Sequence, residues 1–172
     1  MLLRVQRLTH LRSLPRLSSA NTNRLVPLAF TSSLFHTSVK MASDAPYKVV
    51  TTKDAPSAIG PYSQAVVHNG LIFCSGCIPF VPSTMQLVEG DIQAQAQQSL
   101  DNLLAIVQAS GSDKSHILKT TVFLKDMNDF AKVNEVYERV FAPYKPARSA
   151  VEVARLPRDV GVEIECVAAV KA

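Results

Sequence analysis

The sequence has little or none of three features that mark common protein classes. No apolar run approaches the roughly 18–20 residues of a membrane-spanning helix, so a transmembrane protein is not expected. Cysteine is scarce and odd in number, three in all, which argues against a secreted disulfide framework. Neither a Walker-type glycine loop nor a Ser-His-Asp arrangement is present. With 47% hydrophobic and 19% charged residues, the 172-residue chain suits one folded domain.

Acidic residues are absent from the first 43 positions, which hold six Lys or Arg. A basic, Ser-rich, acid-free amphipathic segment is typical of a mitochondrial transit peptide. A disordered basic tail that binds an acidic partner is the alternative. We expect residues 1–43 to be a transit peptide that directs the protein to the mitochondrial matrix, and residues 44–172 to be the folded domain. Met41 offers an internal start, and hence a second, cytosolic form.

The rest of the chain is mildly acidic. Residues 44–172 carry twelve Lys or Arg and fourteen Asp or Glu, a formal net charge of −2, so the +4 of the whole chain comes from its first 43 residues. An acidic domain has no electrostatic attraction for nucleic acid phosphates. We expect neither nucleic acid nor a membrane as a partner.

Hydrophobic periodicity predicts an α+β domain. Runs rich in β-branched residues predict strands at 48–52, 63–68, 71–75, 117–124, 147–154 and 162–170. Apolar residues at spacings of three and four predict helices at 91–110 and 128–141. Asn69–Gly70 favours a hairpin turn, Asp91 can cap the first helix, and Gly111 can end it. The order βββαβαββ allows two helices to cover one face of a mixed sheet.

Side-chain alternation in the last two strands predicts two unlike faces. In 147–154, Val151 and Val153 point one way while Arg148 and Ala150 point the other. We expect the purely apolar set of each strand to meet the helices, which places Arg148 on the same open face as Glu163. A face that mixes charges with small apolar residues suits burial against a second copy of the chain.

Five segments stand in order along this domain: AIGPYSQ at 58–64, SGCIP at 75–79, KTTVFLKD at 119–126, PARS at 146–149 and VEIE at 162–165. Together they resemble the signature segments of the RidA (YjgF) family of reactive-intermediate deaminases, over about residues 47–171. The resemblance implies a chorismate-mutase-like α+β fold and a homotrimer with clefts between subunits. It also implies hydrolysis of 2-imino acids, such as 2-iminobutanoate and 2-iminopropanoate, to 2-keto acids and ammonia.

Two charged residues supply the chemistry of that reaction. The planar guanidinium of Arg148 can bind a carboxylate through two parallel hydrogen bonds. The carboxylate of Glu163 can activate water toward the imine carbon and pass a proton to the departing nitrogen. On spacing alone, a structural ion pair between Arg148 and Glu163 is the more ordinary interpretation. The resemblance assigns both to catalysis.

The resemblance places five further residues in the substrate cleft: Tyr62, Ser75, Gly76, Asn134 and Ala150. It implies that Ser75 and the Gly76 backbone help to hold the carboxylate and that the main chain at Ala150 holds the imine nitrogen. Without the resemblance, Tyr62 would be interpreted as an aromatic residue packed at a turn, and Asn134 as an amide that faces solvent. Many family members carry Cys at the position of Ala150. We expect alanine there to be harmless, because a carboxylate can activate water without a thiol.

The Cys74-x-x-Cys77 pair is a weak signal. A redox pair needs a helix N-terminus to lower its thiol pKa, and Ile78–Pro79 follows instead. Only Cys166 remains as a further thiol, too few for a tetrahedral zinc site. We expect no metal and no organic cofactor. Two other functions stay open: a non-catalytic trimer that binds small carboxylates or chaperones a partner, and an RNA-cleaving protein, against which the acidic domain argues.

Overall fold

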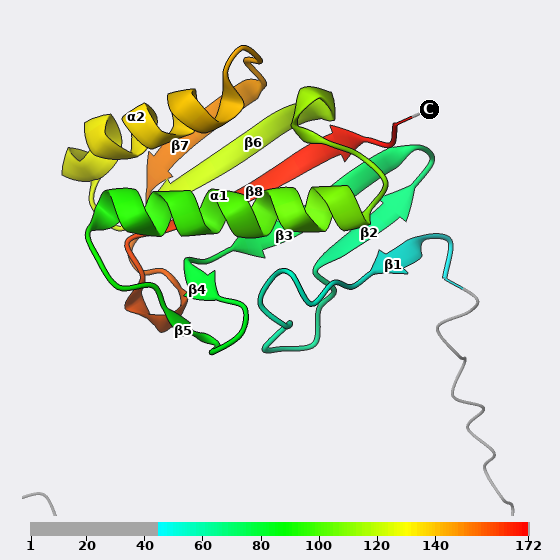
Figure 1. Cartoon of the computed structure of the whole chain (residues 1–172), viewed down its shortest axis with the longest axis horizontal. Helices are drawn as coiled ribbons and strands as arrows, with labels where there is room; N and C mark the ends of the chain where they lie inside the picture. Colours follow the sequence, from blue (N-terminus) through cyan, green and yellow to red (C-terminus); the bar gives the residue numbers. More distant parts are fainter. Residues whose placement is uncertain (1–44, 172) are drawn as a thin grey trace, which may run out of the picture. The chain divides into compact units, whose positions relative to one another are not determined.

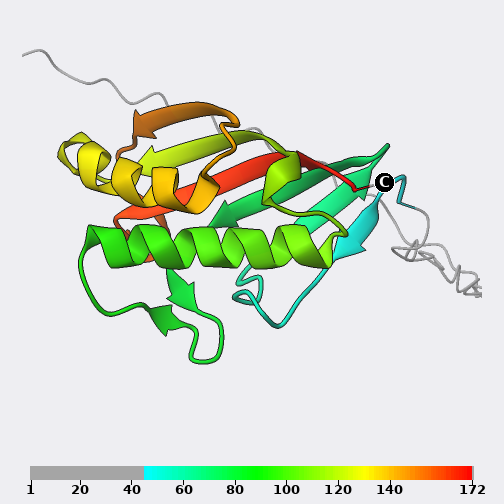
Figure 2. The same ribbon diagram turned by 45° about the horizontal axis from the view of Figure 1, so that its top comes forward.

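Six strands form one mixed sheet in the structure, a computed structural model that describes residues 45–171. In spatial order they are β1 (Lys48–Val50), β2 (Ala65–His68), β3 (Leu71–Cys77), β8 (Val162–Ala169), β6 (Ile117–Leu124) and β7 (Ala147–Glu152). Strands β6 and β7 pair in parallel, and the other neighbours pair antiparallel. The helices α1 (Ile92–Ala109) and α2 (Phe130–Phe141) cover the same face of the sheet (Figures 1 and 2). The predicted α+β architecture is confirmed, whereas the predicted transit peptide and Met41 lie outside the described residues.

Local sequence signals place the element ends where they were expected. Asn69 and Gly70 both have positive φ, 49° and 74°, and form the turn between β2 and β3. The side chain of Asp91 accepts hydrogen bonds from the first-turn amides of Gln93 and Ala94, at 3.0 and 3.1 Å, and caps α1. Gly111, with φ of 83°, follows the last turn of the same helix.

Several short elements were not predicted. A two-stranded ribbon, β4 (Phe80–Val81) and β5 (Gln86–Leu87), occupies the proline-containing segment before α1. Single 3₁₀ turns lie at η2 (Lys114–His116), η3 (Met127–Asp129) and η4 (Pro157–Asp159). Elements of two or three residues are shorter than the window in which hydrophobic periodicity can be recognised, so the sequence pattern carries no signal for them.

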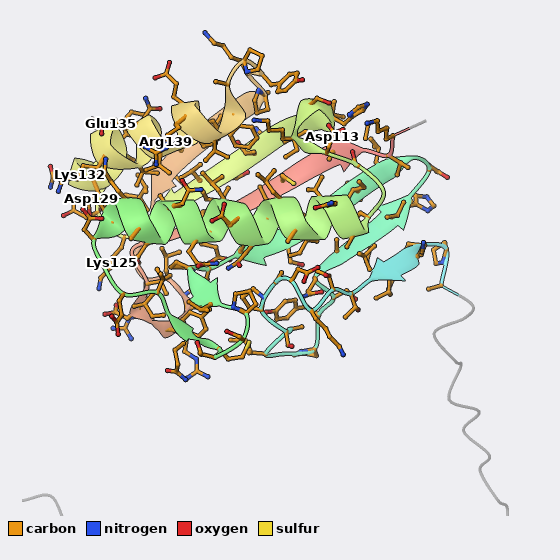
Figure 3. The ribbon with its side chains drawn as sticks, in the orientation of Figure 1. Asp113, Lys125, Asp129, Lys132, Glu135 and Arg139 are labelled. Carbon is orange, nitrogen blue, oxygen red and sulfur yellow. The ribbon has the colours of Figure 1, made fainter. Side chains whose placement is uncertain are left out.

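The core lies between the helices and the sheet. In α1, Leu100 and Leu103 are fully buried, as are Ile72 of β3 and Ile164 of β8 beneath them. Truncation of such a leucine to alanine typically costs about 2–5 kcal/mol of stability. The outer edge of the helix pair is polar: Gln93 donates to Glu135 of α2 at 2.7 Å, and Arg139 of α2 donates to Gln97 at 3.2 Å (Glu135 and Arg139 are labelled in Figure 3).

The predicted orientation of β7 was wrong. Arg148 pairs in register with Thr120 of β6, and Thr120 with Cys166 of β8, and both partners are buried on the helix side of the sheet. Arg148 therefore lies under α2, while Val151 is 41% exposed on the opposite face. Alternation identifies which residues share a face, but not which face a helix covers. The aromatic rings of α2 offer an arginine a favourable surface that a purely apolar pattern does not anticipate.

The face of the sheet away from the helices exposes apolar side chains. Val49, Phe73 and Val151, from three different strands, are 45%, 44% and 41% exposed. Val49, Val66, Phe73 and Val167 follow one another in register across four strands. Exposure of such a row of apolar side chains to water is unfavourable. Burial of this face against a second copy of the chain stays a prediction. Within residues 45–171, neither helix combines the length and the hydropathy needed to cross a bilayer.

Candidate active site

Arg148 lies beneath α2 with its guanidinium against two aromatic rings. Its guanidinium carbon is 4.6 Å from the centre of the Tyr137 ring and 5.5 Å from that of Phe130. No hydrogen bond or ion pair joins Arg148 to any other side chain in the described part of the chain. A partly buried guanidinium whose N–H donors have no hydrogen-bond partner among the described side chains is suited to bind an anion.

A cleft of about 430 Å³ opens beside this guanidinium. It lies between the C-terminal half of α2 and the 142–146 loop, and Asn134 lines it together with Arg148. Asn134 and Tyr137, three residues apart on α2, both line it, so this side of the helix faces the cleft. Tyr137 also belongs to the buried core, whereas Phe130 is 37% exposed.

Tyr137 is a neutral, anchored ring. Its hydroxyl is 2.7 Å from the hydroxyl of Thr120 inside the protein, and its ring centre is 4.4 Å from that of Phe141. Burial raises the pKa of Tyr137, so its hydroxyl stays protonated at neutral pH. Ala150, two residues after Arg148, packs its side chain against the core. Because β7 is an edge strand, part of its main chain is free to bind a ligand.

Glu163 occupies a second cleft, of about 280 Å³, which is also lined by Ile59, Tyr62, Ser75, Gly76, Ile78 and Pro157. Its carboxylate lies directly over Gly76: a Cβ atom at that position would be 1.8 Å from Oε1 of Glu163. Only glycine leaves room for the carboxylate there. Burial, and then the neighbouring charge of Glu165, raise the pKa of Glu163. A partly buried carboxyl with a raised pKa is suited to general acid–base catalysis.

Tyr62 and Ser75 shape the wall of this second cleft. Tyr62 is 49% exposed, and its hydroxyl accepts a 3.4 Å hydrogen bond from the Ile59 amide. The hydroxyl of Ser75 donates to the Ser63 carbonyl at 2.7 Å, and its amide donates to the Gln64 carbonyl at 3.0 Å. Both donors of Ser75 are thus engaged within the chain, and they fix the strand beside Gly76.

Two side-chain amides of α1, the buried Asn102 and the partly buried Gln95, hold the backbone around the second cleft. Asn102 donates to the carbonyls of Ile78 and Phe80, at 3.0 and 2.9 Å. Gln95 accepts a 2.8 Å hydrogen bond from the amide of Gly161, two residues before Glu163. These contacts were not predicted, because a polar residue within an amphipathic helix gives no sign of the distant loop that it binds.

The two predicted catalytic residues lie on opposite faces of the sheet. Arg148 shares its row with Thr120 on the helix side, whereas Glu163 is in register with Phe123 and Val151 on the other side. The expected common face for Arg148 and Glu163, and the alternative of an ion pair between them, are both wrong within one chain. Arg148 and Asn134 line one cleft, and Tyr62, Gly76 and Glu163 line the other. Within one chain, the two charged groups therefore face different clefts.

The three cysteines do not form a reactive site. All are free and buried, and Cys74 lies opposite Cys166 in the β3–β8 ladder. The contact with Cys74, and then burial, raise the pKa of the Cys166 thiol, which disfavours the reactive thiolate. Among residues 45–171, no group of three His, Cys, Asp or Glu side chains is arranged to hold a metal ion.

The fold and its two clefts together define a small α+β protein with Arg148 in a cleft on the helix side of its sheet and Glu163 in a cleft on the other side. A family model described as endoribonuclease L-PSP matches residues 52–170. A RutC family protein of Pyrococcus horikoshii is 52% identical over 121 residues, which covers 70% of this chain and 96% of the relative. A 2-iminobutanoate/2-iminopropanoate deaminase of Escherichia coli K12 is 54% identical over 124 residues, with coverage of 70% and 96%.

Solved structures agree with this assignment. The YjgF gene product of E. coli is 52% identical with a TM-score of 0.69, covering 72% of this chain and 99% of that one. E. coli TdcF, solved with bound serine, is 47% identical with the same TM-score and the same coverage. The chain belongs to the RidA (YjgF) family, as its five ordered segments had indicated.

Proposed function

We propose that this protein is a hydrolytic deaminase of small 2-imino acids, 2-iminobutanoate and 2-iminopropanoate, which it converts to 2-keto acids and ammonia. One observation carries the proposal: two partly buried side chains of opposite charge, Arg148 and Glu163, face clefts without an ion-pair partner among the described residues. Buried charges are normally paired, so each is suited to bind or transform a charged ligand. The activity named for the E. coli relative supports the same reaction.

In the proposed reaction, the cleft with Arg148 and the cleft with Glu163 serve different steps. The guanidinium of Arg148 binds the substrate carboxylate and fixes the adjacent C=N bond. Glu163 takes a proton from water as the water oxygen forms a bond to the imine carbon, and it passes this proton to the imine nitrogen to give a carbinolamine. The hydroxyl proton of the carbinolamine is then transferred to the same nitrogen, the oxygen electron pair forms the C=O bond as the C–N bond breaks, and the keto acid and ammonia leave. The raised pKa of Glu163 suits both directions of proton transfer.

The proposed site is completed between copies of the chain, in a homotrimer. The opposite placement of Arg148 and Glu163, and the exposed apolar side chains of Val49, Phe73 and Val151 on the face away from the helices, support this assembly. We further propose that the protein acts in the mitochondrial matrix, where it protects pyridoxal-phosphate enzymes from reactive imines. The composition of residues 1–43 supports this location.

A keto-acid release assay tests the proposal. An amino-acid dehydratase or oxidase generates the imine, and addition of the protein is expected to accelerate keto-acid formation for short side chains and progressively less for longer ones. An unchanged rate, together with stabilisation of the protein by small carboxylates, would instead identify a binding protein without turnover. The two outcomes separate the enzyme from the non-catalytic alternative.

A further inference from the structure

The guanidinium of Arg148 depends on aromatic rings for its orientation. An arginine side chain has several rotatable bonds, and ordering it in an open cleft costs conformational entropy. Within the described residues, Arg148 has no carboxylate partner, and its guanidinium lies over the rings of Tyr137 and Phe130. The orientation of the guanidinium plane therefore depends on its contacts with these two rings.

Tyr137 is the better fixed of the two rings. It is 7% exposed and lies closer to the guanidinium, whereas Phe130 is 37% exposed. Its hydroxyl is hydrogen-bonded to the buried Thr120 of β6, at 2.7 Å, and its ring packs on Phe141. Thr120 of β6 also pairs in register with Arg148 of β7. The residue that is hydrogen-bonded to Tyr137 therefore lies beside the arginine that the Tyr137 ring covers.

We propose that Tyr137 is a positioning residue: its ring holds the guanidinium of Arg148 so that the N–H donors face the cleft and meet a ligand carboxylate. The identity of that ligand rests on the proposed function, whereas the orientation of Arg148 does not. Tyr137 itself need not touch the substrate.

Ligand binding by the full chain tests the first consequence, with 2-oxobutanoate as the carboxylate probe in calorimetry. Tyr137→Leu is expected to weaken binding about 3- to 30-fold, as loss of a partly buried cation–π contact predicts. Tyr137→Phe keeps the ring and is expected to restore affinity to within about 2-fold. In an Arg148→Ala background, Tyr137→Leu is expected to have no further effect. Val136→Ala, a buried truncation in the same helix, controls for stability: it should lower the melting temperature and leave affinity unchanged.

The Arg148 side-chain resonances test the second consequence without any ligand. In the wild-type chain, the ring current of Tyr137 is expected to shift them upfield and their relaxation to report restricted motion. Tyr137→Leu should abolish both effects, and Tyr137→Phe should retain them. Unshifted, mobile resonances in the wild type, or equal 2-oxobutanoate affinity in the wild type and Tyr137→Leu, would overturn the inference. Ordered resonances in a protein that fails to bind 2-oxobutanoate would support the inference and count against the proposed function.

Discussion

Mixing two inactive variants can reveal whether one active site draws on two copies of the chain. Arg148→Ala removes two charge-assisted hydrogen bonds to the substrate carboxylate, together about 3 kcal/mol or more, which predicts at least about a 100-fold loss of kcat/KM. Glu163→Ala removes the acid–base group and predicts a loss of about 10²- to 10⁴-fold. Each variant alone should therefore be nearly inactive.

The expected recovery follows from the opposite placement of the two side chains. An intact site needs Arg148 from one copy and Glu163 from its neighbour. In an equal mixture that is unfolded and refolded together, about one site in four combines both, so about a quarter of wild-type activity should return in any cyclic assembly. Keto-acid release is the readout, with wild-type protein carried through the same refolding as the reference.

A matched control uses the variant that carries both substitutions. In an equal mixture with wild type, half of the chains are intact, so independent sites would give about half of the reference activity. A site shared between two copies needs two adjacent wild-type chains, so co-refolding should instead give about a quarter of the reference activity. If each chain held a complete site, this mixture would stay at one half and the single-variant mixture would remain inactive. That pair of results would refute a site shared between copies.

Three further predictions concern residues near Glu163 and Arg148. Gly76→Ala should lower kcat at least about 10-fold with a small change in melting temperature, since its Cβ displaces the Glu163 carboxylate; unchanged kcat would contradict the observed contact. The pKa of Glu163 is raised above the ordinary glutamate value, and activity should fall as the pH drops through this raised pKa, because the carboxylate becomes protonated. The stability of the protein should instead fall as the pH rises through the same pKa, because the partly buried group then becomes charged. Glu163→Gln should remove both dependences, and a stability profile identical to wild type would count against the raised value. Ala150→Cys should leave the rate within about 2-fold, because the Ala150 side chain packs against the core; a large gain would point to a thiol nucleophile.

The secondary structure was predictable where local chemistry decides it. The positive φ of Asn69 and Gly70, the cap at Asp91 and the β-branched run of β6 are consequences of a few adjacent residues, and the structure has them where the sequence indicated. The β4–β5 ribbon was missed because two-residue strands depend on tertiary contacts rather than on a repeating pattern. Strand ends differ by a few residues for the same reason.

The arrangement of the candidate site was not predictable from the sequence. Arg148, Glu163, Gly76 and Asn134 line clefts in the structure, but they were chosen from the family resemblance, and spacing alone did not indicate them. The face on which Arg148 lies depends on whether α2 crosses above or below β7, and that is a property of the whole chain. Polarity patterns place charged residues on the face away from the helices, and Arg148 does not follow this pattern. Its position beneath α2 is explained by its contacts with the rings of Phe130 and Tyr137.

The steric fit at Gly76 has a consequence for how this protein tolerates change. The carboxylate of Glu163 fills the volume that a side chain at position 76 would occupy, so a substitution at one position changes the space open to the other. A larger residue at 76 would push the flexible end of the Glu163 side chain aside rather than disturb the strand. Positions 76 and 163, far apart in the sequence, are therefore expected to vary together in related proteins.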